Sequence, residues 1–134
     1  MATITILKSE LDELEAEIKE KNRLIEKLKI EAAMLEGVNL HNSIILLKTV
    51  RDNAKLLIDM YSHMPIPKGD SQGQKFKEEQ IAALGDEAKA QQARLDLALF
   101  RAWSFCQNHK DAVQLLNMEC KIDLPAMVTG AMAS

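Results

Sequence analysis

The sequence predicts an all-α protein in which an N-terminal coiled-coil arm leads into a helical hairpin that self-associates into a helical bundle. The chain of 134 residues has only 5 Gly and 3 Pro, and 4% of its residues are aromatic. A multi-stranded sheet needs many turns and favours β-branched and aromatic residues, so an all-β fold is close to excluded. Hydrophobic residues make up 47% and charged residues 28%, which is typical of a folded chain with a packed core.

The arm is expected to span residues 1–36. Ser9, followed by a cluster of carboxylates, is a good helix cap, so a helix is expected to begin near residue 10. From the start of the chain, apolar residues recur at alternating intervals of three and four, which is the heptad spacing of a coiled coil. The a positions are Ile4, Leu11, Ile18, Ile25 and Ala32, and the d positions are Leu7, Leu14, Lys21, Leu28 and Leu35. This stripe is narrow and flanked by charges, as a coiled-coil seam is.

The hairpin is expected to span residues 37–120. Gly and Asn are weak helix formers, so the heptad is expected to lose its phase at residues 37–39. A broader apolar stripe then predicts a second helix, or a kinked continuation of the first, over residues 40–62. Pro65, Pro67 and Gly69 should end it. Ser71 and Gln74 have the spacing of a capping box, which predicts a last long helix from there to about residue 118.

The tail, residues 121–134, contains Asp123-Leu124-Pro125, which predicts one helical turn through Met127. Its last 11 residues carry no charge. They are expected either to dock against the rest of the chain or to fray.

Two features predict self-association, which we expect to produce a homodimer. One is the uncovered seam of the arm. The other is the segment from Leu95 to Cys106, whose apolar residues surround the helix and must be covered on more than one side. Trp103 is accordingly expected to be buried. The expected interface comprises Leu11, Leu14, Ile18, Lys21, Ile25, Leu28, Leu35, Leu95, Leu99, Phe100 and Trp103.

Charges beside the seam favour an antiparallel pair of arms. Parallel pairing would place Glu10 against Glu15, Glu31 against Glu36 and Lys21 against Lys21. Antiparallel pairing about an axis near residue 23 instead brings Lys8 to Glu36 and Glu15 to Lys29. At roughly 0.2 to 0.5 kcal/mol for each exposed pair, the bias toward the antiparallel arrangement is about 1 or 2 kcal/mol.

Catalytic chemistry has little support in the sequence, and no catalytic residue, metal or cofactor is expected. Cys106 and His109 lie three residues apart on one predicted helix, where they could share a metal or form a nucleophile pair. A zinc site normally shows two recognisable ligand pairs within a chain, so a part-buried core thiol and a core histidine are the stronger interpretation. Cys120 is likewise expected to be reduced and part-buried. An enzyme that uses Cys106 and His109 is the third hypothesis.

The uncovered seam and the apolar segment of residues 95–106 favour a protein-binding function. The leading hypothesis is a non-enzymatic oligomeric adaptor, assembly factor or protein-binding regulator with an unidentified protein partner. The alternative is a dimeric nucleic-acid-associated regulator. Nucleic acid is not the expected partner, because the net charge is -3 and carboxylates interrupt the basic cluster. That cluster consists of Lys19, Lys21, Arg23, Lys27 and Lys29.

No membrane association is expected. The longest uncharged stretches have 11 residues, whereas a membrane-spanning helix needs about 20 apolar residues. The amino end also makes a poor signal peptide, because no positive residues precede its short apolar run. The cytoplasm is therefore the expected location.

Overall fold

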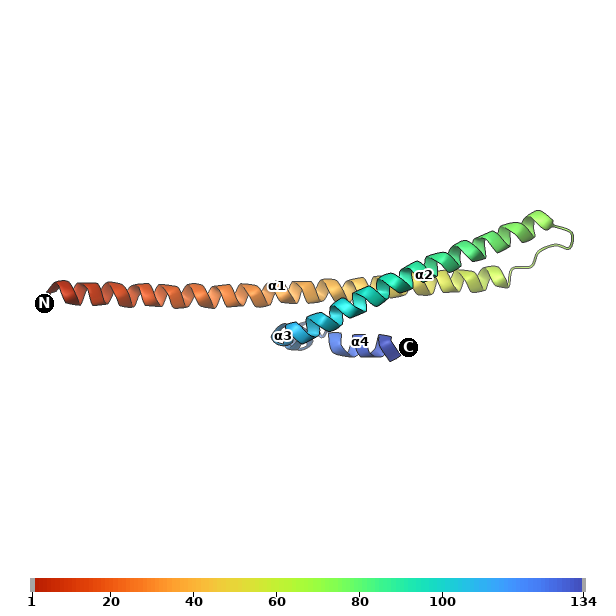
Figure 1. Ribbon diagram of the computed structural model, residues 1–134. Coiled ribbons are helices and arrows are strands. Elements are labelled where there is room, and N and C mark those ends of the chain that lie inside the picture. Colours follow the sequence, from red (N-terminus) through yellow and green to blue (C-terminus); the bar gives the residue numbers. More distant parts are fainter. Residues whose placement is uncertain (1, 134) are drawn as a thin grey trace.

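The computed structural model describes the backbone of residues 2–133 and the side chains of residues 7–131. Every regular element in this part of the chain is a helix, so the all-α prediction is confirmed. The helices are α1 (Ala2–Ser62), α2 (Ser71–Asn108), α3 (Lys110–Cys120) and α4 (Leu124–Ala133). The first half of α1 projects alone, α2 runs back along its second half, and α3 and α4 lie near the middle of the molecule (Figure 1).

Helix α1 is longer than the sequence predicts, and it is a single helix. It begins at Ala2 rather than near residue 10, since no Gly or Pro precedes Ser9 to prevent a helix there. It also passes through Gly37 and Asn39 without a break. One glycine in a helix costs only about 1 kcal/mol relative to alanine, and packing around Gly37 offsets that cost.

Gly37 lies where α3 approaches α1 closely. It is buried, and a Cβ atom placed on it would contact the Leu116 side chain and lie 3.2 Å from the Phe105 ring. The absence of a side chain at residue 37 therefore lets α2 and α3 pack directly on the α1 backbone.

Replacing Gly37 with leucine should lower the free energy of unfolding by roughly 1 to 3 kcal/mol, because the added side chain overfills this contact. Gly85, inside α2, is the matched control, since a Cβ there would meet nothing within 4 Å. Gly85→Leu should instead stabilise the protein by roughly 0.5 to 1 kcal/mol through helix propensity. Urea denaturation followed by circular dichroism measures both. Equal effects of the two substitutions would contradict the close approach at Gly37.

The loop between α1 and α2 lies where the sequence predicts it, over residues 63–70. The N-cap of α2, however, differs from the prediction. The N-cap of α2 is Asp70, whose carboxylate accepts a hydrogen bond of 2.9 Å from the Gly73 backbone N–H. The predicted capping box of Ser71 and Gln74 is therefore wrong. Asp70 takes the cap because the preceding turn, with Gly69 at φ +89°, aims its side chain at the open end of the helix.

The predicted long helix to residue 118 is also wrong, because α2 ends at Asn108. His109 has φ −132° and ψ 56°, and it joins α2 to α3. Asn and His are both weak helix formers. The change of direction at His109 lets Ala112 and Leu116 of α3 pack against α1.

Two clusters of buried side chains hold the helices together. The first joins α1, α2 and α4 and contains Ile44, Leu95, Ala98, Leu99, Ala102 and Val128. The second joins all four helices and contains Ala33, Phe105, Ala112, Leu116 and Leu124. Met127 packs against both. The tail therefore docks, and its helix is longer than the single predicted turn, because Leu124 and Val128 bury their side chains.

Candidate protein-interaction surfaces

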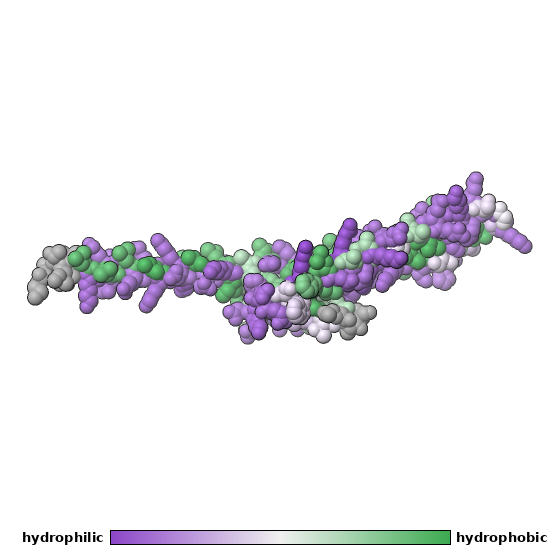
Figure 2. All heavy atoms as spheres, viewed as in Figure 1, coloured by the Kyte–Doolittle hydropathy of each residue, from purple (hydrophilic) through white to green (hydrophobic). Residues whose placement is uncertain are grey.

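The heptad side chains of the arm form an exposed apolar row, which we call the arm seam. It consists of Leu7, Leu11, Leu14, Ile18, Lys21, Ile25, Leu28, Ala32 and Leu35, all of which are exposed. Ile4, the first predicted a residue, has a side chain outside the described residues. The leucine and isoleucine side chains of the seam are 48 to 62% exposed. Figure 2 shows apolar residues in a row along the arm with hydrophilic residues beside it. The seam is thus present on the helix surface and is not covered by this chain.

Most of the basic cluster on the arm is paired with carboxylates of the same helix. The Arg23 guanidinium lies 2.6 Å from the Glu20 carboxylate, and the Lys29 ammonium lies 3.4 Å from the Glu26 carboxylate. The Lys27 ammonium lies 4.0 Å from the Glu31 carboxylate. The Arg23 guanidinium hydrogen-bonds the Glu20 carboxylate and holds its pKa below the ordinary value. Exposed pairs of this kind stabilise a helix little. They do neutralise a surface that would otherwise attract phosphates.

The apolar segment of α2 divides into a buried side and an exposed side. Leu95 and Leu99 are buried within this chain, against α1 and α4. Phe100 is 63% exposed and Trp103 is 49% exposed. The chain itself therefore does not bury Trp103, although the sequence predicts that Trp103 is buried. Their rings stack with centroids 6.3 Å apart. With the half-exposed Leu97, they form what we call the aromatic patch. Of the four residues predicted on α2 for the interface, only Phe100 and Trp103 are available to a partner.

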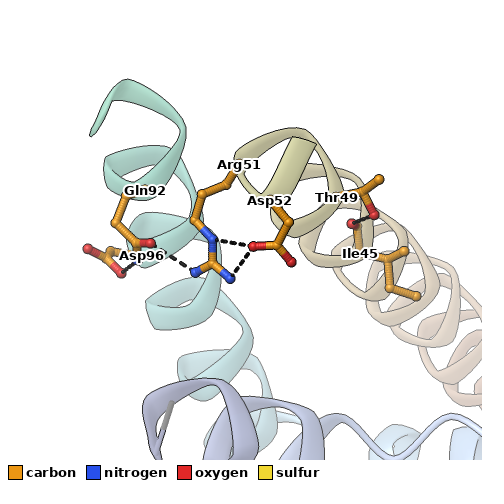
Figure 3. Close-up of polar contacts among 6 residues, drawn as sticks. All are labelled: Ile45, Thr49, Arg51, Asp52, Gln92 and Asp96. Atoms are coloured by element: carbon orange, nitrogen blue, oxygen red, sulfur yellow. Dashed lines mark hydrogen bonds and ion pairs between the residues drawn. The ribbon is translucent and has the colours of Figure 1, made fainter. Parts of the chain in front are cut away.

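A polar network that the sequence did not reveal links α1 to α2 beside the aromatic patch (Figure 3). The Arg51 guanidinium donates hydrogen bonds to the Gln92 side chain at 2.9 Å and to the Asp52 carboxylate at 2.9 and 3.0 Å. Gln92 in turn donates to Asp96 at 2.9 Å. Asp96 lines a shallow groove of about 340 Å³ together with Phe100 and Trp103. The Arg51–Gln92 hydrogen bond is the one contact of this network that joins α1 to α2.

Cys106 and His109 have different surroundings. Cys106 is half-buried against the second core cluster, and burial together with the nearby Asp123 carboxylate raises the pKa of its thiol. His109 is exposed, with its ring against Phe105 at a centroid distance of 4.8 Å, so the prediction of a core histidine is wrong. Cys120 is exposed rather than part-buried. Over the described residues, no three His, Cys, Asp or Glu side chains are grouped so that they could hold a metal ion.

The two thiols should react with iodoacetamide at different rates at pH 7. Cys106 should react more slowly, because the reactive thiolate is disfavoured by its raised pKa and the side chain is half-buried. Cys120 is exposed and should be modified first, as mass spectrometry of timed samples would show. Faster modification of Cys106 would revive the hypothesis of a catalytic thiol.

Comparison with known proteins identifies no relative: no family model, no curated protein and no solved structure matches the chain. None of the helices, as far as they are described, is long and apolar enough to cross a membrane.

Proposed function

We propose that this protein is a non-enzymatic coiled-coil protein of the cytoplasm that self-associates through its arm and acts as an adaptor, assembly factor or protein-binding regulator. The observation that carries the proposal is the arm seam. Eight of its nine members are apolar, all nine are exposed, and no other element of the described chain covers them.

The hydrophobic effect supports burial of this row by another helix. Burying one leucine or isoleucine contributes roughly 1.5 to 3 kcal/mol, so a seam of this length provides more than enough free energy for association. Narrow apolar stripes of heptad spacing pair with other helices through knobs-into-holes packing. A second copy of the same chain carries the complementary stripe.

The aromatic patch supports the adaptor part of the proposal. Phe100 and Trp103 are exposed on α2 and lie outside the arm seam, so pairing of the arms would leave them accessible. Exposed aromatic residues are over-represented at protein-binding surfaces. The protein would thus self-associate through the arm and bind its partner through the hairpin.

Light scattering after size exclusion tests self-association. A dimer should have twice the mass of the 15.0 kDa chain at micromolar concentration. A monomer of 15.0 kDa under these conditions would overturn the proposal. The adaptor role requires a pull-down in which Trp103→Ala, compared with the wild type, loses a specific protein.

Lys21→Ile should raise the melting temperature of the associated protein, because Lys21 is the one charged member of the arm seam. A polar residue in a seam costs stability while selecting register and partner. The same substitution should leave the helix content of the hairpin unchanged. If the melting temperature fell, the assignment of Lys21 to a d position would be wrong.

A further inference from the structure

Asp96 lies in one row with the two rings of the aromatic patch. Phe100 follows it by four residues and Trp103 by seven, which is the spacing of neighbours on one side of a helix. All three side chains are exposed, and they line the groove of about 340 Å³ together with the buried Leu99. The groove therefore offers two aromatic rings, one aliphatic side chain and one carboxylate.

The Asp96 carboxylate is a negative charge without a paired cation. Within residues 7–131 it forms no salt bridge, and its hydrogen bond from Gln92, at 2.9 Å, comes from a neutral amide. The Arg51 guanidinium of α1 donates to Asp52 and Gln92 instead. The network in Figure 3 thus contains two carboxylates and one guanidinium, which leaves one negative charge beside the rings.

Other cations of α2 do not neutralise this charge. Arg94 precedes Asp96 by two residues and Arg101 follows it by five, so each is turned by roughly 140 to 160° round the helix from Asp96. Lys89 lies on the same side as Asp96 but two turns earlier, about 10 Å along the axis. The groove therefore complements a positive group that another molecule supplies.

We propose that the groove binds the guanidinium of an arginine on a partner protein. The inference rests on the adaptor role proposed above and names the chemistry that the partner presents. A cation over the face of an aromatic ring is attracted by the negative charge of that face, and tryptophan gives the strongest attraction. A guanidinium also donates paired hydrogen bonds to a carboxylate. In the groove its plane stacks on a ring while its N–H groups donate to Asp96.

The exposure of the rings favours arginine over lysine. Phe100 and Trp103 are both about half exposed or more, so a bound cation stays partly in water. An ammonium is compact and strongly hydrated, whereas a guanidinium is flat and more weakly hydrated. Arginine therefore loses less hydration when it lies on the rings. It is also the charged residue that is enriched at protein interfaces.

Nuclear magnetic resonance of the full chain tests the proposal. Trp103 is the only tryptophan in the sequence, so its indole N–H gives a single signal that reports on the groove. N-acetyl-arginine amide should shift this signal in a saturable way, with a dissociation constant in the millimolar range. N-acetyl-citrulline amide has a neutral group of similar shape and should bind about two- to fivefold more weakly. N-acetyl-lysine amide should also bind more weakly than arginine.

Asp96→Asn tests the role of the carboxylate. Asparagine keeps a side-chain oxygen that can accept from Gln92, so the variant should retain the fold, which circular dichroism checks. It should weaken binding of the arginine probe about two- to fivefold and leave binding of the citrulline probe nearly unchanged. Asp86→Asn replaces an exposed carboxylate three turns earlier on α2 and should change neither.

Several outcomes would overturn the arginine site. They are equal binding of the arginine probe and either of the other probes, arginine binding by Asp96→Asn that equals that of the wild type, and no shift with any probe. A Trp103 signal that moves with protein concentration instead would place a second copy on the patch and would also overturn it. All of these results would leave self-association through the arm standing. A monomer by light scattering, by contrast, would overturn self-association and leave arginine binding standing.

Discussion

Phe105→Ala should destabilise the folded protein by about 3 to 5 kcal/mol, the usual cost of removing a buried phenylalanine side chain. Phe105 is only 4% exposed, and it lies in the core cluster that joins α1, α2, α3 and α4. Small domains are stable by only about 5 to 15 kcal/mol, so this loss would remove a large fraction of the total. Urea denaturation followed by far-ultraviolet circular dichroism gives the difference.

Trp103→Ala is the matched control for that measurement. Trp103 lies two residues earlier on the same helix, but its side chain is 49% exposed and it is absent from both core clusters. Its replacement should cost less than about 1 kcal/mol, as surface substitutions do. A loss as large as that of Phe105→Ala would mean that the aromatic patch is buried in the native assembly.

Leu14→Glu combined with Leu28→Glu should abolish self-association without unfolding the hairpin. Both residues occupy d positions of the arm seam and are more than half exposed in the single chain, so the change leaves the cores intact. The pair would lose the burial of four leucines, at roughly 1.5 kcal/mol or more each, and would place carboxylates in the seam. The dissociation constant should rise at least about 1,000-fold, measurable by sedimentation velocity across a concentration series.

Ala16→Glu serves as the control for these charges. Ala16 is exposed but lies off the seam, on the opposite side of the arm. A carboxylate there should leave the dissociation constant nearly unchanged. Equal weakening by Ala16→Glu would mean that net charge, rather than the seam, controls association.

The parts of the fold that the sequence predicts are those governed by local patterns. The all-α class, the heptad of the arm and the loop over residues 63–70 follow from spacing, Pro and Gly alone. The errors arise where a distant contact decides. Gly37 looks like a helix end in the sequence, yet it lies inside α1 because α3 packs on it. Likewise, α4 extends beyond one turn because Leu124 and Val128 dock in the cores.

The candidate interaction surfaces show the same difference between features set by local patterns and features set by distant contacts. The residues of the arm seam could be identified from periodicity, since an amphipathic pattern states which side of a helix is apolar. On α2 the apolar residues surround the helix, so periodicity could not tell that Leu95 and Leu99 face inward and Phe100 and Trp103 outward. The polar network could have been suspected from Arg51. This residue follows Leu47 by four residues, so it lies on the side of α1 that meets α2.

The continuity of α1 has a thermodynamic consequence. The same helix carries the arm seam in its first half and contributes residues from Ala33 to Leu47 to the two core clusters. A partner that binds only the folded state stabilises that state by mass action. When the partner is a second copy, the stability of the hairpin rises with the logarithm of the protein's own concentration. The free energy of unfolding would then be largest at high protein concentration and would decrease on dilution.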